Sequence, residues 1–210
     1  MSLHGSEIME VRYGEKVLHF DPIQHTYSLD TMPLKSVTTY LKESGYCHPW
    51  HGDGSAATLG RYVHEATALD DLDQLDMDTV DPRIATRVMG WRKFCRERKF
   101  IPDMQRAERP CFDPIYLVGG TPDRPGLLDG VASVGEIKTG QPAKWHALQC
   151  AAYVQMLGRH FKEYERAPSW IVYLKDDGDY DFVLLADRRL PALFAAIVAC
   201  VNGKEFYADR

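Results

Sequence analysis

The sequence predicts one α/β domain, built on a central mixed β-sheet flanked by helices. The chain has 210 residues, of which 45% are hydrophobic and 26% charged, enough for one well-packed core and too few for two large domains. The predicted elements come as helices, then strands, a helix and more strands, an order that fits an α/β sandwich with a central mixed sheet. We expect a single domain over residues 1–210, with 1–35 as an N-terminal β-hairpin extension and a core over about 53–206.

The N-terminal half is expected to form a β-hairpin followed by helices. A β-hairpin from about 11 to 29 precedes a short helix over 37–43 and a helix that carries His64. An aspartate-rich stretch at 70–81 is most simply a solvated loop, and a basic helix follows over about 87–99. The basic helix either presents an ordinary solvated face or lines a channel for an anionic ligand.

The C-terminal half is expected to contain most of the strands. Strands are predicted near 105–109 and 116–120, and Asp129-Gly130 has the composition of a tight turn before the strand that contains Glu136. Pro142 suits the first turn of the next helix. The chain then closes with a strand pair and a helix, over 170–175, 180–185 and 191–206.

The triplet Glu136-Ile137-Lys138 is the most informative feature of the chain. Residues two apart in a strand point to the same face, so the Glu136 carboxylate and the Lys138 ammonium should lie together while Ile137 points to the opposite layer. With Asp123 as a second carboxylate and the backbone carbonyl of Ile137 as a further oxygen ligand, the set suits Mg²⁺ or Mn²⁺, as one or two ions. Alternating charges on the solvated face of an ordinary strand would give the same triplet.

Four short motifs follow one another between about Leu59 and Met156. In chain order they are Gly60-x-x-x-His64, Gly120-Thr-Pro-Asp123-Arg124, Glu136-Ile-Lys138-Thr-Gly140 and Gln149-x-x-x-Tyr153. In these motifs the chain resembles the PD-(D/E)XK nuclease superfamily, in its RecB-type and phage-exonuclease branch. The resemblance implies a restriction-endonuclease-like core. It also implies metal ligation by His64, Asp123 and Glu136, and catalysis by Lys138 together with the two carboxylates.

The same resemblance implies that DNA is the substrate and that Gln149 and Tyr153 lie near it. Arg124, beside the second carboxylate, and Trp145, near the start of the same helix, are further candidates for substrate binding. Trp145 suits a packing role equally well. A core-facing tyrosine beside a buried glutamine is the alternative for Gln149 and Tyr153.

His64 can also be placed by helix geometry. At 100° per residue, the expected core stripe of its helix contains Leu59, Tyr62, Val63, Ala66 and Leu69, and His64 lies nearly opposite. That position suits either a solvated histidine or one facing a ligand. Histidine is a better ligand for Mn²⁺ than for Mg²⁺, so we expect activity in Mn²⁺ at least equal to that in Mg²⁺.

Two other acidic residues were weighed as ligands. Asp129 is assigned to turn chemistry because glycine follows it between apolar segments. Glu108 begins a strand-like stretch before Gly119, where some phage exonucleases carry an additional acidic residue. We favour a solvated strand position for Glu108.

Composition limits the other properties. Five cysteines without close pairs argue against a disulfide framework, a zinc site and the cysteine pattern of an iron–sulfur cluster. The absence of a signal-like N-terminus and of a stretch that approaches the length of a membrane span predicts a cytoplasmic protein with no membrane partner. A net charge of −5 is low for a DNA-binding enzyme and favours one that encircles DNA or is recruited by a partner.

The function expected from these features is that of a metal-dependent deoxyribonuclease, an exonuclease of phage or recombination DNA processing. A structure-selective endonuclease on the same fold and a catalytically silent DNA-binding or scaffold module remain as alternatives. DNA is the expected partner. The chain is further expected to bind other copies of itself, as a homo-oligomer, or a recombination protein.

Overall fold

The computed structural model describes residues 7–47 and 54–208. It has the α/β composition that the sequence predicts, with two mixed sheets and five α-helices among the described residues. Residue 53, where the core was expected to begin, lies outside the described ranges.

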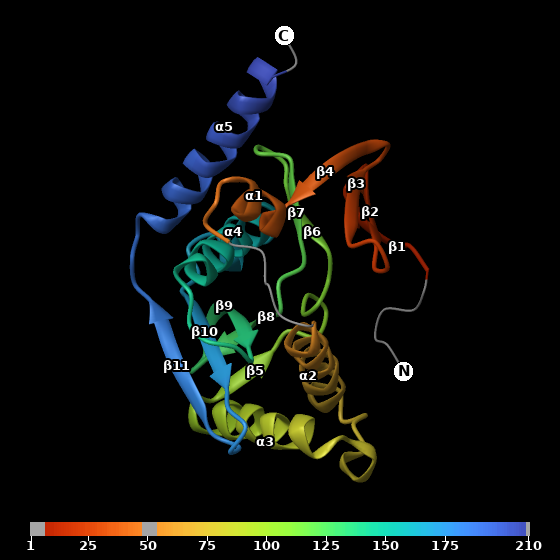
Figure 1. The fold of residues 1–210 in the computed structure, drawn as a ribbon, viewed down its shortest axis with the longest axis vertical. Helices are drawn as coiled ribbons and strands as arrows, with labels where there is room; N and C mark the ends of the chain where they lie inside the picture. The colour runs from red at the N-terminus through yellow and green to blue at the C-terminus, as the bar shows by residue number, and fades with distance from the viewer. Residues whose placement is uncertain (1–6, 48–53, 209–210) are drawn as a thin grey trace.

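A five-stranded sheet forms the centre of the lower half of the molecule in Figure 1. Its strands stand in the order β11-β10-β9-β8-β5; β9 and β10 run parallel, and the other neighbours are antiparallel. The strands are β5 (Phe100–Pro102), β8 (Arg124–Leu128), β9 (Val131–Lys138), β10 (Ser169–Leu174) and β11 (Tyr180–Leu185). Strand β9, which contains Glu136, is the middle strand of this sheet.

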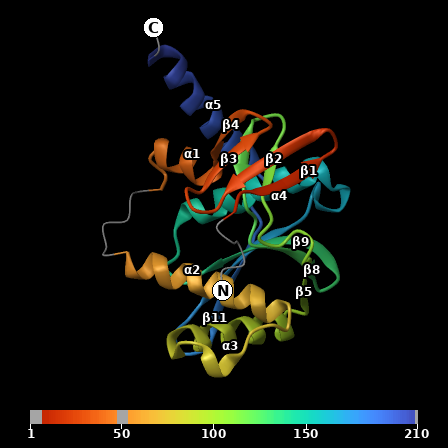
Figure 2. The ribbon, with the colours of Figure 1, turned by 90° about the vertical axis from the view of Figure 1, so that its right-hand side faces the viewer.

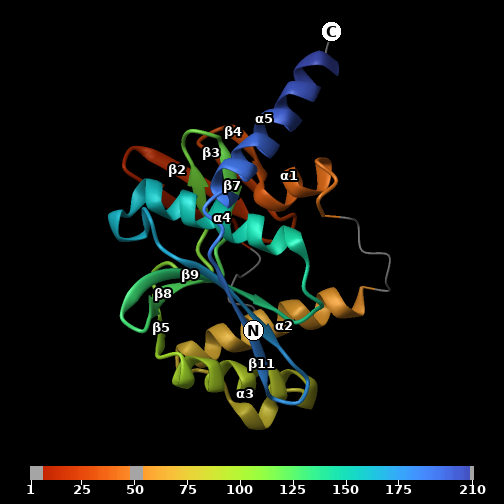
Figure 3. The same ribbon diagram turned by 90° about the vertical axis from the view of Figure 1, so that its left-hand side faces the viewer.

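Helices cover both faces of this sheet. On one face lie α2 (Ser55–Asp71) and α3 (Pro82–Glu97), and Ile137 packs there against Val63 and Trp91. On the other face lies α4 (Lys144–His160), which packs on Val134 of β9. Figures 1 and 3 show the resulting order of layers, with α3 below the sheet and α4 above it.

A second sheet makes the N-terminal half more extensive than the predicted hairpin. Six strands stand in the order β1-β2-β3-β4-β7-β6, and Figure 2 shows β1 to β4 beside α4. The strands are β1 (Met9–Tyr13), β2 (Lys16–Asp21), β3 (Thr26–Leu29), β4 (Met32–Ser36), β6 (Cys111–Asp113) and β7 (Val118–Gly120). The central mixed sheet flanked by helices is present, but the predicted N-terminal hairpin is instead a four-stranded meander whose last strand pairs with β7.

The remaining helices lie outside the central sheet. The short helix α1 (Val37–Glu43) begins at a Ser36 cap, and α5 (Leu190–Ala208) packs on α1 and α4. Two single 3₁₀ turns cover Met77–Thr79 and Lys162–Tyr164. The predicted strand at 105–109 is wrong, since residues 104–108 form turns, whereas the pair β10 and β11 and the turn at Asp129-Gly130 are confirmed.

Helix α5 corrects one expectation about apolar length. Among the described residues, it is long and apolar enough to cross a membrane by length and composition alone, although such a helix is weak evidence of a membrane segment. Only 22% of its most apolar window is buried within the molecule. The expectation that no stretch approaches the required length is wrong for this helix.

Candidate functional site

Strand β9 presents Glu136 and Lys138 on the face that α4 covers. Lys138 Nζ donates to Glu136 Oε2 at 2.7 Å, and the Glu136 side chain is fully buried. Ile137 points to the other layer, where it packs in the cluster with Trp91 and Trp170. The strand alternation expected from the sequence is thus confirmed, and it brings a buried carboxylate and an ammonium together.

Asp123 stands at the entrance to β8, directly beside this pair. Its Oδ2 accepts the backbone N–H of Ile137 at 2.9 Å, and its side chain is 10% exposed. Since Ile137 lies between Glu136 and Lys138, this bond holds the Asp123 carboxylate close to both. The pairing of β8 with β9 sets the geometry, with Arg124 opposite Gly135.

Glu108 joins Asp123 and His64 in a compact cluster. His64 Nδ1 lies 3.5 Å from a carboxylate oxygen of each, and one ligand atom from each of the three residues falls within 4.8 Å of the others. Glu108 sits in a turn with φ of 53°, and its backbone N–H donates to the Pro122 carbonyl at 3.0 Å. The expectation of a solvated strand position for Glu108 is therefore wrong.

His64 reaches the cluster from α2. Its side chain is 26% exposed, and it stands on the side of the helix away from the buried Val63 and Ala66, as predicted. Gly60, one turn earlier, would place a Cβ only 3.4 Å from the Thr139 hydroxyl, so a small residue lets α2 approach the end of β9. Tyr62, assigned to the core stripe, is instead 45% exposed.

Arg124 is fully buried, which corrects its assignment as a substrate-binding residue. Its side chain is fully buried, with Nη1 2.6 Å from Glu108 Oε1 and Nε 2.9 Å from Asp71 Oδ2. Nη2 donates to the Thr67 hydroxyl at 2.8 Å, and to the His64 carbonyl at 3.4 Å. Arg124 therefore ties α2 to the Glu108 turn and holds two members of the cluster in place.

The buried charges shift one another's pKa values. Burial, then the neighbouring Asp123 carboxylate, raises the pKa of Glu136 to about 8. Burial would lower the pKa of Lys138, but the Glu136 and Asp123 carboxylates outweigh it and raise that pKa. Burial opposes ionisation of Glu108 too, yet His64 and Arg124 bring its pKa down to about 2. The cluster thus holds carboxylates and cations together in a low-dielectric site, where each group shifts the ionisation of its neighbours.

The first turns of α4 close the site from above. Gln149 Nε2 donates to the Tyr153 hydroxyl at 3.1 Å, and both side chains are buried. Gly120 leaves room for Tyr153, because a Cβ there would lie 2.7 Å from its ring. Trp145 is half-buried, packs on the core that α4 shares with α5, and has Lys138 Nζ 5.7 Å from its ring centroid.

The donor set fits a hard divalent cation. Glu136 Oε1 and Gln149 Oε1 are buried and make no hydrogen bond among the described residues, so these two oxygen acceptors remain available. Carboxylate and amide oxygens with one imidazole are ligands that Mg²⁺ and, still better, Mn²⁺ accept. The composition of the site supports such an ion without identifying it.

Several charged residues of the acidic and basic stretches around 70–99 form ion pairs within the domain. Arg92 on α3 pairs with Asp70, and Lys93 pairs with Asp179. Asp71 is almost fully buried and accepts the indole N–H of Trp91 at 2.7 Å, so it does not belong to a solvated loop. Helix α3 packs behind α2 and on the sheet, and nothing in these contacts favours the channel role.

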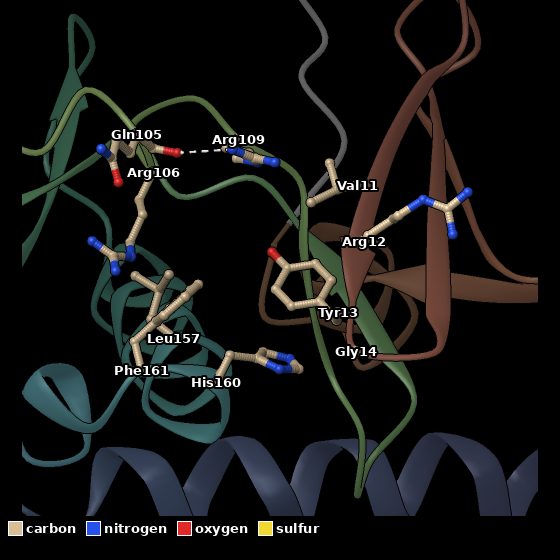
Figure 4. A pocket seen from close by; sticks show the side chains of 10 residues that line it. All are labelled: Val11, Arg12, Tyr13, Gly14, Gln105, Arg106, Arg109, Leu157, His160 and Phe161. Carbon is tan, nitrogen blue, oxygen red and sulfur yellow. Dashed lines mark hydrogen bonds between the residues drawn. The ribbon is translucent and has the colours of Figure 1, made fainter.

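A separate pocket of about 370 Å³ lies between the N-terminal meander and the end of α4, and Figure 4 shows its lining. Arg106, one of three arginines in the lining, lies 4.1 Å over the Phe161 ring and pairs with Asp103 and Glu163. Tyr13 donates its hydroxyl to the Pro110 carbonyl at 2.9 Å. These groups are therefore engaged in contacts within the fold.

The five cysteines have different environments. Cys47, Cys111 and Cys150 are buried, Cys95 is half-buried and Cys200 is exposed.

Comparison with known proteins adds no relative to this picture. No protein-family model matches the chain, and a search of curated proteins finds no match.

Sequence reasoning placed two acidic residues of this region in solvent. Glu108 was considered as a ligand, but a solvated strand position was favoured, and Asp71 was assigned to a solvated loop. The signal that could have found them is Arg124, a charged residue at the start of an apolar strand, which requires carboxylates when it is buried.

Proposed function

We propose that the protein is a metal-dependent deoxyribonuclease that hydrolyses phosphodiester bonds, an exonuclease of phage or recombination DNA processing. One observation carries the proposal: Asp123, Glu136 and Lys138 lie together beside His64 and Glu108, with a buried carboxylate oxygen free among the described residues. The cluster of buried charges has no packing role that apolar residues of similar size could not fill better.

The restriction-endonuclease-like core is part of the same proposal. Strand β8 pairs antiparallel with β9, β9 pairs parallel with β10, and helices cover both faces of the sheet. The site lies where β8 begins and β9 ends. This arrangement, with the four sequence motifs, supports a place in the PD-(D/E)XK superfamily.

Asp123 and His64 would hold Mg²⁺ or Mn²⁺ together with Glu108, the third member of the compact cluster. Glu136 and the Ile137 carbonyl would be the further ligands. When bound, such an ion supplies positive charge beside a phosphate and lowers the pKa of water. Lys138 lies 17% exposed at the edge of the site, where its ammonium can contact the attacked phosphate or orient the attacking water. Glu136 holds that ammonium in place through the 2.7 Å contact.

Gln149 and Tyr153 would act on the substrate indirectly. Both are buried, and the bond between them fixes the wall of the site that α4 provides. Trp145, half-buried beside Lys138, is better placed to contact DNA than either of them.

The test is a nuclease assay with Mn²⁺ and Mg²⁺ on end-labelled linear DNA and on closed circular DNA. We expect degradation of the linear DNA, and loss of activity by at least about 100-fold in Lys138→Met and Glu136→Gln. Lys162→Met and Glu165→Gln make the same changes at exposed positions and should retain full activity. Cleavage of circular DNA would favour the structure-selective endonuclease, and an inactive wild type that still binds DNA would favour the silent module.

A further inference from the structure

The outer face of α5 carries no charged residue. At 100° per residue, the residues opposite the buried stripe of Phe194, Ile197, Val198 and Val201 are all small or apolar. They are Ala192, Leu193, Ala196, Ala199, Cys200, Gly203, Phe206 and Tyr207. Leu193, Phe206 and Tyr207 are 46%, 59% and 74% exposed, which is unusual for large apolar side chains on one helix face.

The helix projects beyond the rest of the molecule. Figures 1, 2 and 3 all show the C-terminal half of α5 extending past the other elements. Its inner face is fixed to the domain, because Tyr40 donates its hydroxyl to Asn202 at 2.9 Å and Lys35 pairs with Glu205. The outer face is therefore held in place, and a Cβ added at Gly203 would meet nothing within 4 Å.

We propose that this outer face binds the same face of a second copy of the chain, so that two α5 helices pack antiparallel about a two-fold axis. An isologous interface requires that one set of positions map onto itself. A two-fold axis between Ala199 and Cys200 does so for all eight positions. It sets Tyr207 against Ala192, Phe206 against Leu193, and Gly203 against Ala196, so that large residues oppose smaller ones and the centre permits close approach.

The area available matches the lower limit for a specific dimer. At roughly 200 Å² per large side chain, the three exposed large residues present on the order of 350 Å², and the small residues bring the face to roughly 500 Å². Two copies would then bury about 1,000 Å² in total, where specific interfaces begin. We therefore expect a dimer that dissociates on dilution.

The symmetric match of sizes identifies a second copy as the occupant. A lipid bilayer would need only an apolar surface, with no relation between the two ends of the helix. Spanning a bilayer would also separate the inner face of α5 from Tyr40 and Lys35 and expose its buried stripe. The proposal is independent of the nuclease activity, because α5 contributes no residue to the site.

Sedimentation equilibrium of the full chain without DNA tests the proposal. Over about 1 to 200 µM protein, the mass should rise from 23.9 kDa toward twice that value. Ala196→Glu places a charge near the two-fold axis and should raise the dissociation constant at least tenfold. Ala208→Glu makes the same change at an exposed alanine on the inner side of the same helix and should leave the dimer intact.

Cys200 provides a second, local measurement. It is the exposed cysteine of the five and lies beside the proposed axis, so a short bis-maleimide should link two copies through their Cys200 thiols by addition. The link should be lost in Cys200→Ser and in Ala196→Glu, while both variants keep the thermal midpoint of the wild type at concentrations where it is monomeric. A monomer at 200 µM overturns the proposal, as does a dimer that Ala196→Glu leaves unchanged, or flotation of a monomeric wild type with phosphatidylcholine vesicles.

Discussion

Arg124 should be one of the most sensitive residues of the fold, even though it touches no substrate. Its guanidinium is fully buried between Asp71 and Glu108, with nitrogen–oxygen distances of 2.9 and 2.6 Å. Arg124→Met preserves most of the side-chain volume and leaves two carboxylates without their cation. Removing one partner of a buried ion pair costs about 3–5 kcal/mol, a large share of the ~5–15 kcal/mol that stabilises a typical domain.

The loss should depend on pH in a defined direction. Burial already raises the pKa of Asp71 against the pull of Arg124, and the pKa of Glu108 would also rise once Arg124 is absent. Protonation then relieves the unpaired charges as the pH falls. The destabilisation by Arg124→Met should therefore be larger at pH 8 than at pH 5.

Urea unfolding followed by tryptophan fluorescence measures both effects, with Arg189→Met as the matched control. Arg189 pairs with Asp187 at 2.8 Å, but its side chain is 81% exposed, so its loss should change stability little. A cycle with Asp71→Asn should show a coupling energy of about 1–3 kcal/mol with Arg124. If Arg124→Met lowers the free energy of unfolding at pH 8 no more than Arg189→Met does, the buried ion pairs of Arg124 do not hold α2 to the Glu108 turn.

Three further predictions concern metal preference, pH and packing. Nuclease activity in Mn²⁺ should at least equal that in Mg²⁺; a clear preference for Mg²⁺ that His64→Ala leaves unchanged would exclude His64 as a ligand. Burial lowers the pKa of His146 to about 4, so the unfolded chain takes up the proton first, and up to ~3 kcal/mol of stability should be lost as the pH falls from 6.5 to 4. His146→Gln should flatten this part of the stability–pH curve, and an unchanged slope would contradict the assignment. Gly120→Ala should destabilise the fold by about 1–3 kcal/mol because its Cβ meets the Tyr153 ring. A Cβ at Gly140 would meet nothing within 4 Å, so Gly140→Ala should change stability by less than ~0.5 kcal/mol. Equal unfolding midpoints for the two variants would disprove the close contact at Gly120.

Features that depend on neighbouring residues could be read directly from the chain. The shared face of Glu136 and Lys138 follows from strand alternation, and the turn at Asp129-Gly130 follows from residues that adopt positive φ. The orientation of His64 away from the core follows from helix periodicity in the same way. The physical reason is that backbone geometry alone fixes which side chains within one element point together.

Features that depend on distant partners were decided by packing. Whether Arg124 faces solvent or the interior depends on Asp71, Glu108 and Thr67, and the last lies 57 residues away. Glu108 enters the site because a turn, and not the predicted strand, carries it to His64. The pairing of the N-terminal meander with β7 likewise joins segments that no local pattern connects. A charged side chain is buried only where the folded chain supplies its counter-ion, and that condition is met in three dimensions.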